Sequence, residues 1–154
     1  RDLHSFPTRR SSDLKVTYEK VADNGMPKKV VESYLVDADS FTLAEAKMIE
    51  EITPFVSMGE FNISNIRKVN YAELFLNEDD KCDRYYRCKV LYVTIDEKNG
   101  VEKKTPAFML VKSDSLPNAV AELEKQMGKG LADYEIASVA ETALMDVFQY
   151  VPAQ

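Results

Sequence analysis

Residues Val36-Asp-Ala-Asp-Ser-Phe41 return later in the chain as Val111-Lys-Ser-Asp-Ser-Leu116. In both places a β-rich segment ends and an Asp-Ser pair follows, whose side-chain oxygens can cap the first turn of a helix. The likeness continues on both sides of this stretch, at a spacing that stays between 73 and 75 residues. The further matches pair Lys15 and Tyr18 with Lys89 and Tyr92, Asn24-Gly25 with Asn99-Gly100, Lys28-Lys29 with Lys103-Lys104, and Glu73-Leu74-Phe75 with Asp146-Val147-Phe148. So many matches in the same order indicate a tandem duplication.

Each copy is expected to fold in the order ββαβ. An alternating segment leads to the Asn-Gly pair, and Asn-Gly between two β-rich runs is typical of a hairpin. A helix follows, because apolar residues recur three or four positions apart and so share one face. The residues on these faces are Phe41, Ala44, Met48 and Ile52 in the first copy, and Leu116, Ala119, Val120, Leu123 and Met127 in the second. The third strands carry Phe61, Ile63 and Ile66, and Tyr134, Ile136 and Val139.

The fold class that follows is α+β, with tandem duplicated ββαβ units. The first copy spans 15–76, a charged connector spans 77–84, and the second copy spans 85–150. A single unit of this size buries little surface, so we expect one shared core. It would consist of a mostly antiparallel sheet with two helices packed on it, around a pseudo-two-fold axis. The closing triplets at 73–75 and 146–148 are expected to anchor the last strand of each copy, with an exposed docking hook as the alternative.

The first fourteen residues, 1–14, do not fit the repeat. They show neither helical nor strand periodicity, and they resemble the in-frame translation of a common short-read sequencing adapter. We therefore expect a non-native, adapter-derived segment, with a disordered basic arm as the alternative. In the second copy Tyr85-Tyr-Arg-Cys88 lead into the first strand, and Ser11-Ser-Asp-Leu14 occupy the matching places. Any pairing made by residues 11–14 is then expected to be opportunistic.

The composition argues against several classes of protein. The chain has 154 residues, with 20 Lys+Arg against 26 Asp+Glu, one His, two Cys and a net charge of −6. Without 1–14 the net charge is −7 and no histidine remains. An acidic chain is poorly suited to gripping phosphate backbones, and two cysteines without histidine do not complete a zinc site. We therefore expect no catalytic, metal-binding or cofactor-binding residue and no cofactor, and the shortage of reactive groups leans against an enzyme.

No apolar run is long enough to span a bilayer, and no signal peptide is recognised. We therefore expect no membrane partner and a cytoplasmic location, with Cys82 and Cys88 as free thiols.

Paired lysines provide the candidate binding surface. Lys28 and Lys29 recur as Lys103 and Lys104, each pair beside an Asn-Gly turn. Two basic hairpins could straddle a nucleic acid or an acidic partner, with Tyr85 and Tyr86 stacking on it if their rings face outward. The alternative is that lysines on edge strands discourage sheet-to-sheet aggregation.

Several short runs resemble an uncharacterised family, domain of unknown function family 4494, over essentially 15–150. They are Tyr18-Glu-Lys20, Asn24-Gly-Met26, Lys28-Lys-Val30, Tyr34-Leu-Val-Asp-Ala38, Ser40-Phe-Thr42, Asp96-Glu-Lys98, Glu102-Lys-Lys104, Ala132-Asp-Tyr-Glu-Ile-Ala-Ser138 and Met145-Asp-Val-Phe148. The resemblance implies an origin in gut bacteria of the Bacteroides type, their phages or mobile elements. The adapter-like segment 1–14 favours a metagenomic gene fragment. The resemblance implies no activity, so it assigns no role to any residue.

These observations favour a non-enzymatic binding or accessory protein, associated with a phage or mobile element. A protein partner or self-association is the preferred mode of action. Nucleic-acid binding through the paired-lysine hairpins is an alternative that the acidic balance disfavours. A small-ligand binder or enzyme, with a cleft between the two copies, is the other alternative.

Overall fold

The computed structural model describes residues 9–56 and 61–149. The elements in chain order are β1 (Arg9–Val21), β2 (Pro27–Asp37), α1 (Phe41–Ile52), the short 3-10 helix η1 (Thr53–Phe55), β3 (Asn62–Tyr71), β4 (Glu73–Phe75), β5 (Arg84–Ile95), β6 (Glu102–Ser113), α2 (Leu116–Met127), β7 (Tyr134–Glu141) and β8 (Leu144–Gln149). The α+β class predicted from the sequence is confirmed. Within the described residues, neither helix combines the length and apolar character that crossing a bilayer would require.

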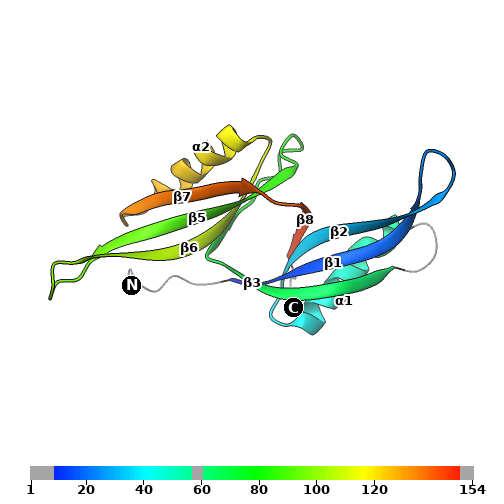
Figure 1. The fold of residues 1–154 in the computed structure, drawn as a ribbon, viewed down its shortest axis with the longest axis horizontal. Helices are drawn as coiled ribbons and strands as arrows, with labels where there is room; N and C mark the ends of the chain where they lie inside the picture. Colours follow the sequence, from blue (N-terminus) through cyan, green and yellow to red (C-terminus); the bar gives the residue numbers. More distant parts are fainter. Residues whose placement is uncertain (1–8, 57–60, 150–154) are drawn as a thin grey trace. The chain divides into compact units, whose positions relative to one another are not determined.

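The strands form two four-stranded sheets, ordered β3-β1-β2-β8 and β4-β6-β5-β7. The chain divides accordingly into two compact units, and each sheet carries one helix on one face (Figure 1). Among the described residues, the α1 unit comprises 10–56, 61–69 and 143–149, and the α2 unit comprises 70–142 together with residue 9. The pairings β1–β2, β5–β6 and β5–β7 are antiparallel, as expected. The expectation of one sheet with a shared core is corrected, because each unit has its own apolar cluster beneath its own helix.

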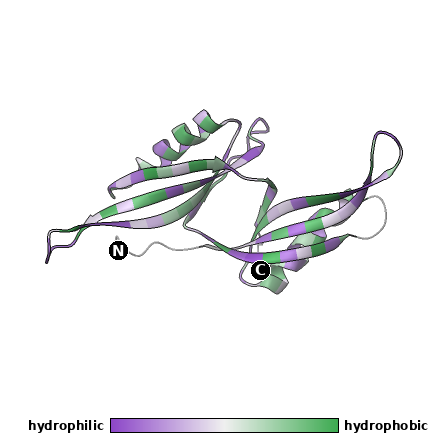
Figure 2. Ribbon diagram, in the orientation of Figure 1, coloured by the Kyte–Doolittle hydropathy of each residue, from purple (hydrophilic) through white to green (hydrophobic). Residues whose placement is uncertain are grey.

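Both helices begin where the Asp-Ser pairs predict. The Ser40 Oγ accepts a hydrogen bond from the Leu43 amide at 3.2 Å, and the Ser115 Oγ accepts one from the Asn118 amide at 3.3 Å. These bonds satisfy one of the free amide groups in each first turn. The residues buried on the sheet side are Ala44, Met48 and Ile52 in α1, and Ala119, Leu123 and Met127 in α2. Figure 2 shows the corresponding alternation of hydrophobic and hydrophilic residues along strands and helices.

The two halves also agree in what their strands bury. In β2 the fully buried run is Tyr34-Leu35-Val36, and in β6 it is Met109-Leu110-Val111. These runs occupy matching positions of the repeat, and each ends four positions before the capping serine. Predicted helix positions Phe41 and Leu116 are instead about half exposed, because they lie in the first turn, beyond the end of the apolar cluster.

The last strand of each predicted copy belongs to the other copy's sheet. In β4, Glu73-Leu74-Phe75 pair in parallel with Met109-Leu110-Val111 of β6. In β8, Asp146-Val147-Phe148 pair in parallel with Tyr34-Leu35-Val36 of β2. The triplets therefore anchor strands as expected, but each completes the sheet of the opposite half.

Connection lengths explain this exchange. A strand that pairs with the free edge of β2 occupies the place of β8, three strand spacings from β3. That distance is about 14 Å. The chain has only Ala72 between β3 and β4, so its reach over two residue steps is about 7 Å. Thr142 and Ala143 connect β7 to β8, and three steps reach roughly 10 Å, which also falls short. Neither closing strand can return to the open edge of its own sheet.

Residues 9–14, which belong to the segment set aside above, form the first part of β1. Leu14 is fully buried in the α1 core, and Ser11 and Ser12 are almost fully buried. They continue the antiparallel ladder, with Ser11 opposite Asp37 and Leu14 opposite Tyr34. The adapter origin of 1–14 stays a prediction.

Candidate functional site

The β1–β2 hairpin ends in a tip formed by residues 21–29, called the first tip below. Its ladder ends at the pair Val21 and Pro27. The Ala22 amide then donates to the Met26 carbonyl at 2.9 Å, and the Gly25 amide donates to the Ala22 carbonyl at 2.9 Å. Gly25 has φ of +79°, a left-handed conformation that favours glycine. The Asn-Gly pair thus makes the predicted hairpin, with a turn of three residues.

The β5–β6 hairpin ends in the second tip, residues 95–104, which runs past the end of β7 with no helix beside it (Figure 1). The Asp96 amide donates to the Val101 carbonyl at 2.9 Å, and the Gly100 amide donates to the Asp96 carbonyl at 2.7 Å. Gly100 again supplies the positive φ, at +64°. Both tips therefore use the glycine of the Asn-Gly pair in the same way, on loops of slightly different length.

The four candidate lysines all lie on these tips and are exposed. Lys28 stands opposite Lys20 in the ladder, and Lys103 stands opposite Thr94. The Lys104 ammonium contacts the Glu135 carboxylate at 3.0 Å, and this contact raises the pKa of Lys104. The lysine part of the predicted surface is thus solvent-accessible, and its binding role stays a prediction.

Tyr85 and Tyr86 are not part of that surface. Only 3% of Tyr85 and 1% of Tyr86 is exposed. Tyr86 packs in the apolar cluster beneath α2, and the Lys112 ammonium lies 5.9 Å from the centre of the Tyr85 ring. The expectation that these rings stack on a nucleic acid is corrected, because both are core residues at the start of β5.

The lysines also occupy strand segments whose outer edges have no β partner in the described residues. β8 pairs with β2 only from Ser33 onward, and β4 pairs with β6 only from Met109 onward. The open segment of β6 contains Pro106, which has no amide hydrogen to offer. Lysine and proline are typical devices against strand addition. The position of the lysines therefore fits the alternative hypothesis, that they discourage aggregation through the open strand edges.

Sequence reasoning missed a set of exposed apolar side chains on the same tips. The exposed fractions are 48% for Val21 and 62% for Met26 on the first tip, and 68% for Ile95 and 59% for Val101 on the second. These residues match one another in the repeat, and each pair brackets an Asn-Gly turn. That bracketing was visible in the sequence, but strand periodicity alone does not say which apolar residues lie beyond the core.

The charges on the tips nearly cancel. The first tip carries Lys28 and Lys29 against Asp23, and the second carries three lysines against three acidic residues. A surface for nucleic acid needs an excess of positive charge to release counterions from phosphates. The tips therefore combine apolar side chains with mixed charge.

Chemically reactive groups are sparse in the part of the chain that the structure describes. No group of three or more His, Cys, Asp or Glu residues is placed to hold a metal ion there. Cys82 and Cys88 are free thiols. Cys88 is buried in the α2 core, and burial raises the pKa of its thiol to about 11. At neutral pH this thiol is protonated and a poor nucleophile.

Comparison with known proteins adds the family. The family model described as "Domain of unknown function (DUF4494)" matches residues 13–150. This chain belongs to the DUF4494 family. The match covers both hairpins and both helices, so both tips are parts of the DUF4494 domain. No curated protein matches the chain, and no solved structure matches it.

Proposed function

We propose that this DUF4494 protein is a non-enzymatic binding or accessory protein that docks on a protein partner through its two hairpin tips. The observation that carries the proposal is the matched exposure of Val21 and Met26 on one tip, and of Ile95 and Val101 on the other. Each tip extends a two-stranded ribbon, so its apolar side chains are held on a defined backbone. The near-balance of charge favours a protein over a nucleic acid.

The chemistry of the tips suggests the chemistry of the partner. Aliphatic side chains of this size contribute roughly 25 cal/mol for each Å² that a partner removes from water. Each apolar pair is flanked by two lysines, Lys28 and Lys29 on the first tip and Lys103 and Lys104 on the second. These lysines would attract and orient a partner whose binding site is bordered by acidic residues. We infer a partner with apolar pockets edged by Asp and Glu, and a second copy of this chain is a candidate because the chain itself is acidic.

The cytoplasm is the compartment that this proposal assumes, because both thiols are free. An association with a phage or mobile element is supported only by the resemblance to the family.

Photocrosslinking tests the docking proposal. A photoreactive phenylalanine analogue replaces Met26 in one variant and Val101 in another, and Lys15, an exposed residue in the middle of β1, is the control position. We expect both tips to crosslink to the same protein, and Val21→Ser with Ile95→Ser to abolish the products. Products that are equally strong from Lys15 would contradict the proposal. Sedimentation velocity over a concentration series shows whether the captured protein is a second copy.

A gel shift at low salt tests the nucleic-acid alternative. Single- and double-stranded DNA and RNA are mixed with the unaltered chain and with a variant in which Lys28, Lys29, Lys103 and Lys104 are changed to Ala. We expect no shift. A shift that disappears in the lysine variant would replace the protein partner with a nucleic acid.

A further inference from the structure

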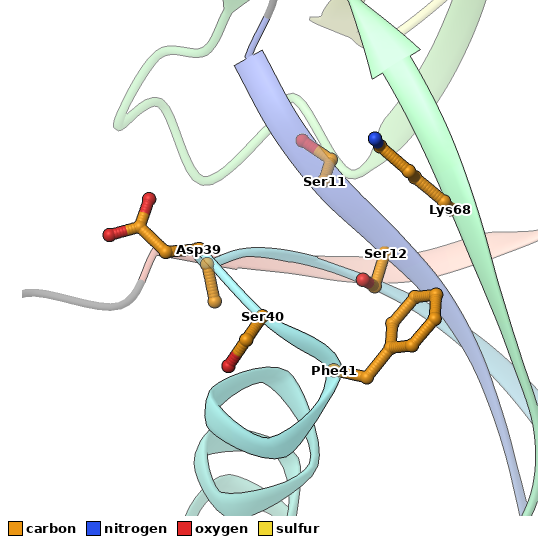
Figure 3. A pocket seen from close by; sticks show the side chains of 7 residues that line it. Ser11, Ser12, Asp39, Ser40, Phe41 and Lys68 are labelled. Carbon is orange, nitrogen blue, oxygen red and sulfur yellow. The ribbon is translucent and has the colours of Figure 1, made fainter.

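A cavity of about 170 Å³, partly open to solvent, lies in the α1 unit, between the start of β1 and the start of α1. Its lining residues are Ser11, Ser12, Ala38, Asp39, Ser40, Phe41 and Lys68. Figure 3 shows Ser11 and Ser12 on β1, the Phe41 ring beside Ser12, and the Lys68 side chain reaching over from β3. The cavity lies within the α1 unit, its lining includes no residue of either tip, and the proposed function makes no use of it.

The α2 unit has a tyrosine at the place where this cavity opens. Ser12 stands opposite Val36, two residues before the core residue Leu14. Tyr86 stands opposite Val111, two residues before the core residue Cys88. Because alternate residues of a strand face the same side, Ser12 and Tyr86 both face the helix of their unit. The small hydroxymethyl group of Ser12 and the phenol ring of Tyr86 therefore occupy equivalent positions in two otherwise similar cores.

In the α2 unit the Tyr86 ring fills this position. Tyr86 is the largest of the fully buried side chains, with 1% of its surface exposed. At the rim it takes part in a hydrogen bond with Arg84, and this bond raises the pKa of the guanidinium. Arg84 also lies 3.7 Å from the Glu141 carboxylate. The position of Tyr86 thus combines apolar surroundings for the ring with polar groups near the hydroxyl.

The cavity beside Ser12 has the same division. Ala38 and Phe41 supply apolar wall, and Asp39, Ser40 and Lys68 supply polar groups. Its volume is enough for one aromatic ring, since an apolar cavity of roughly 150 Å³ in another protein holds benzene. The Phe41 ring can pack against such a guest edge to face or offset, as aromatic pairs prefer.

The strand around Ser12 is also poorly satisfied. Among the described residues, the buried side-chain oxygens without a hydrogen-bond partner are Ser11 Oγ and Asp13 Oδ1. Both belong to residues 11–14, whose counterparts in the α2 unit are Tyr85-Tyr-Arg-Cys88. There the Arg87 guanidinium lies 4.2 Å from the centre of the Phe108 ring, and Tyr85 has Lys112 over its face. Of these two atoms, Ser11 Oγ belongs to a residue that lines the cavity. Asp13 does not line it, and its other carboxylate oxygen lies 3.3 Å from the Arg67 guanidinium.

We propose that the cavity beside Ser12 is a binding site for one phenolic ring, the group that Tyr86 places at the equivalent position of the α2 unit. In a Ser12→Tyr variant the chain itself supplies the ring, which completes the α1 core. Delivered as a free molecule, a para-substituted phenol enters the same space, with its hydroxyl toward Lys68 and Ser40. The site is independent of the proposed docking function.

Two variants and one probe test this site. The probe is p-cresol, the side-chain analogue of tyrosine, added to the unaltered chain during thermal unfolding and in an NMR titration of backbone amides. We expect p-cresol to raise the melting temperature and to shift the amide signals of Ser12, Ala38 and Phe41. Ser12→Tyr is expected to raise the melting temperature by about 3 °C or more and to abolish the effect of p-cresol.

The matched control is Ser138→Tyr, the same substitution at an exposed position of β7. This variant should keep the original melting temperature to within about 1 °C and should still respond to p-cresol. Absence of amide shifts around the cavity would overturn the site, and this result needs no variant to fold. Retention of the p-cresol response in a folded Ser12→Tyr protein would overturn it equally, because the ring would then bind elsewhere.

Discussion

The exchange of closing strands predicts a crossed effect of two matching substitutions. Phe148 lies near the end of the chain, yet its ring stacks on Tyr34 with centroids 5.6 Å apart and packs against the α1 core. Phe75 lies before the middle of the chain, yet it packs against the α2 core. Phe148→Ala should therefore destabilise the unit built mainly from the first half of the sequence, and Phe75→Ala the unit built from the second half.

The magnitudes follow from burial. Truncating a fully buried phenylalanine to alanine costs about 3–5 kcal/mol, and both rings are half-buried, so about 2 kcal/mol is expected for each. Phe148 also loses a stacked aromatic partner, which adds roughly 0.5–1.5 kcal/mol. The free energy of opening should fall by about 3 kcal/mol in the α1 unit of Phe148→Ala, and by about 2 kcal/mol in the α2 unit of Phe75→Ala.

Native-state hydrogen exchange measures both changes separately, because amides report the opening of their own unit. Since 1.4 kcal/mol corresponds to a factor of ten, exchange in Phe41–Ile52 should accelerate roughly 100-fold in Phe148→Ala. Exchange in Leu116–Met127 should accelerate roughly 30-fold in Phe75→Ala. Faster exchange in α2 for Phe148→Ala, with α1 unchanged, would refute the strand exchange. Equal acceleration of both helices would refute the division into two cores.

Three further outcomes follow from the local geometry. Gly25→Ala and Gly100→Ala should each lower the stability by about 1 kcal/mol in urea denaturation, because both glycines have positive φ with open space around Cα, so the loss is backbone strain alone. Ser115→Ala should cost about 1 kcal/mol in the same assay by removing the cap of α2, whereas a neutral result would show that the cap is not formed. Cys88 should resist iodoacetamide at pH 8 while Cys82 is alkylated. The raised pKa of Cys88 means that its contribution to stability is full below pH 9 and is lost as the pH rises from about 9 to 11, so a stability that increases over this range would contradict its burial.

The sequence predicts the parts of this fold that depend on local spacing. Alternate and four-residue spacings identify the core positions, and the Asp-Ser pairs place the helix starts at Ser40 and Ser115, because these signals act within one turn or one hairpin. Local spacing does not determine which strand a closing strand pairs with. That pairing depends on the order β3-β1-β2, which puts the open edge of β2 out of reach of a one-residue connection, and strand order leaves no periodic trace in the sequence.

The lysines of the candidate surface could be predicted from local spacing, whereas the burial of its tyrosines could not. The lysines were found because they repeat beside a recognisable turn, and they do lie on the tips. Tyr85 and Tyr86 were misplaced because aromatic residues at a strand start look the same whether they face solvent or a helix. Only the burial of Tyr86 beneath α2 distinguishes the two cases, and that depends on how far the helix extends along the sheet.

The strand exchange also bears on where a partner can bind. Each closing strand covers only the inner part of the β2 or β6 edge, from Ser33 or Met109 onward, and lysine and proline guard the outer part against strand addition. Contact by main-chain pairing is therefore disfavoured at these edges, which leaves contact by side chains. The tips contribute no residue to either apolar cluster, so their side chains can be changed without loss of core packing. The proposed partner therefore rests on exposed aliphatic residues that contribute nothing to the core and that recur at matching places in both halves.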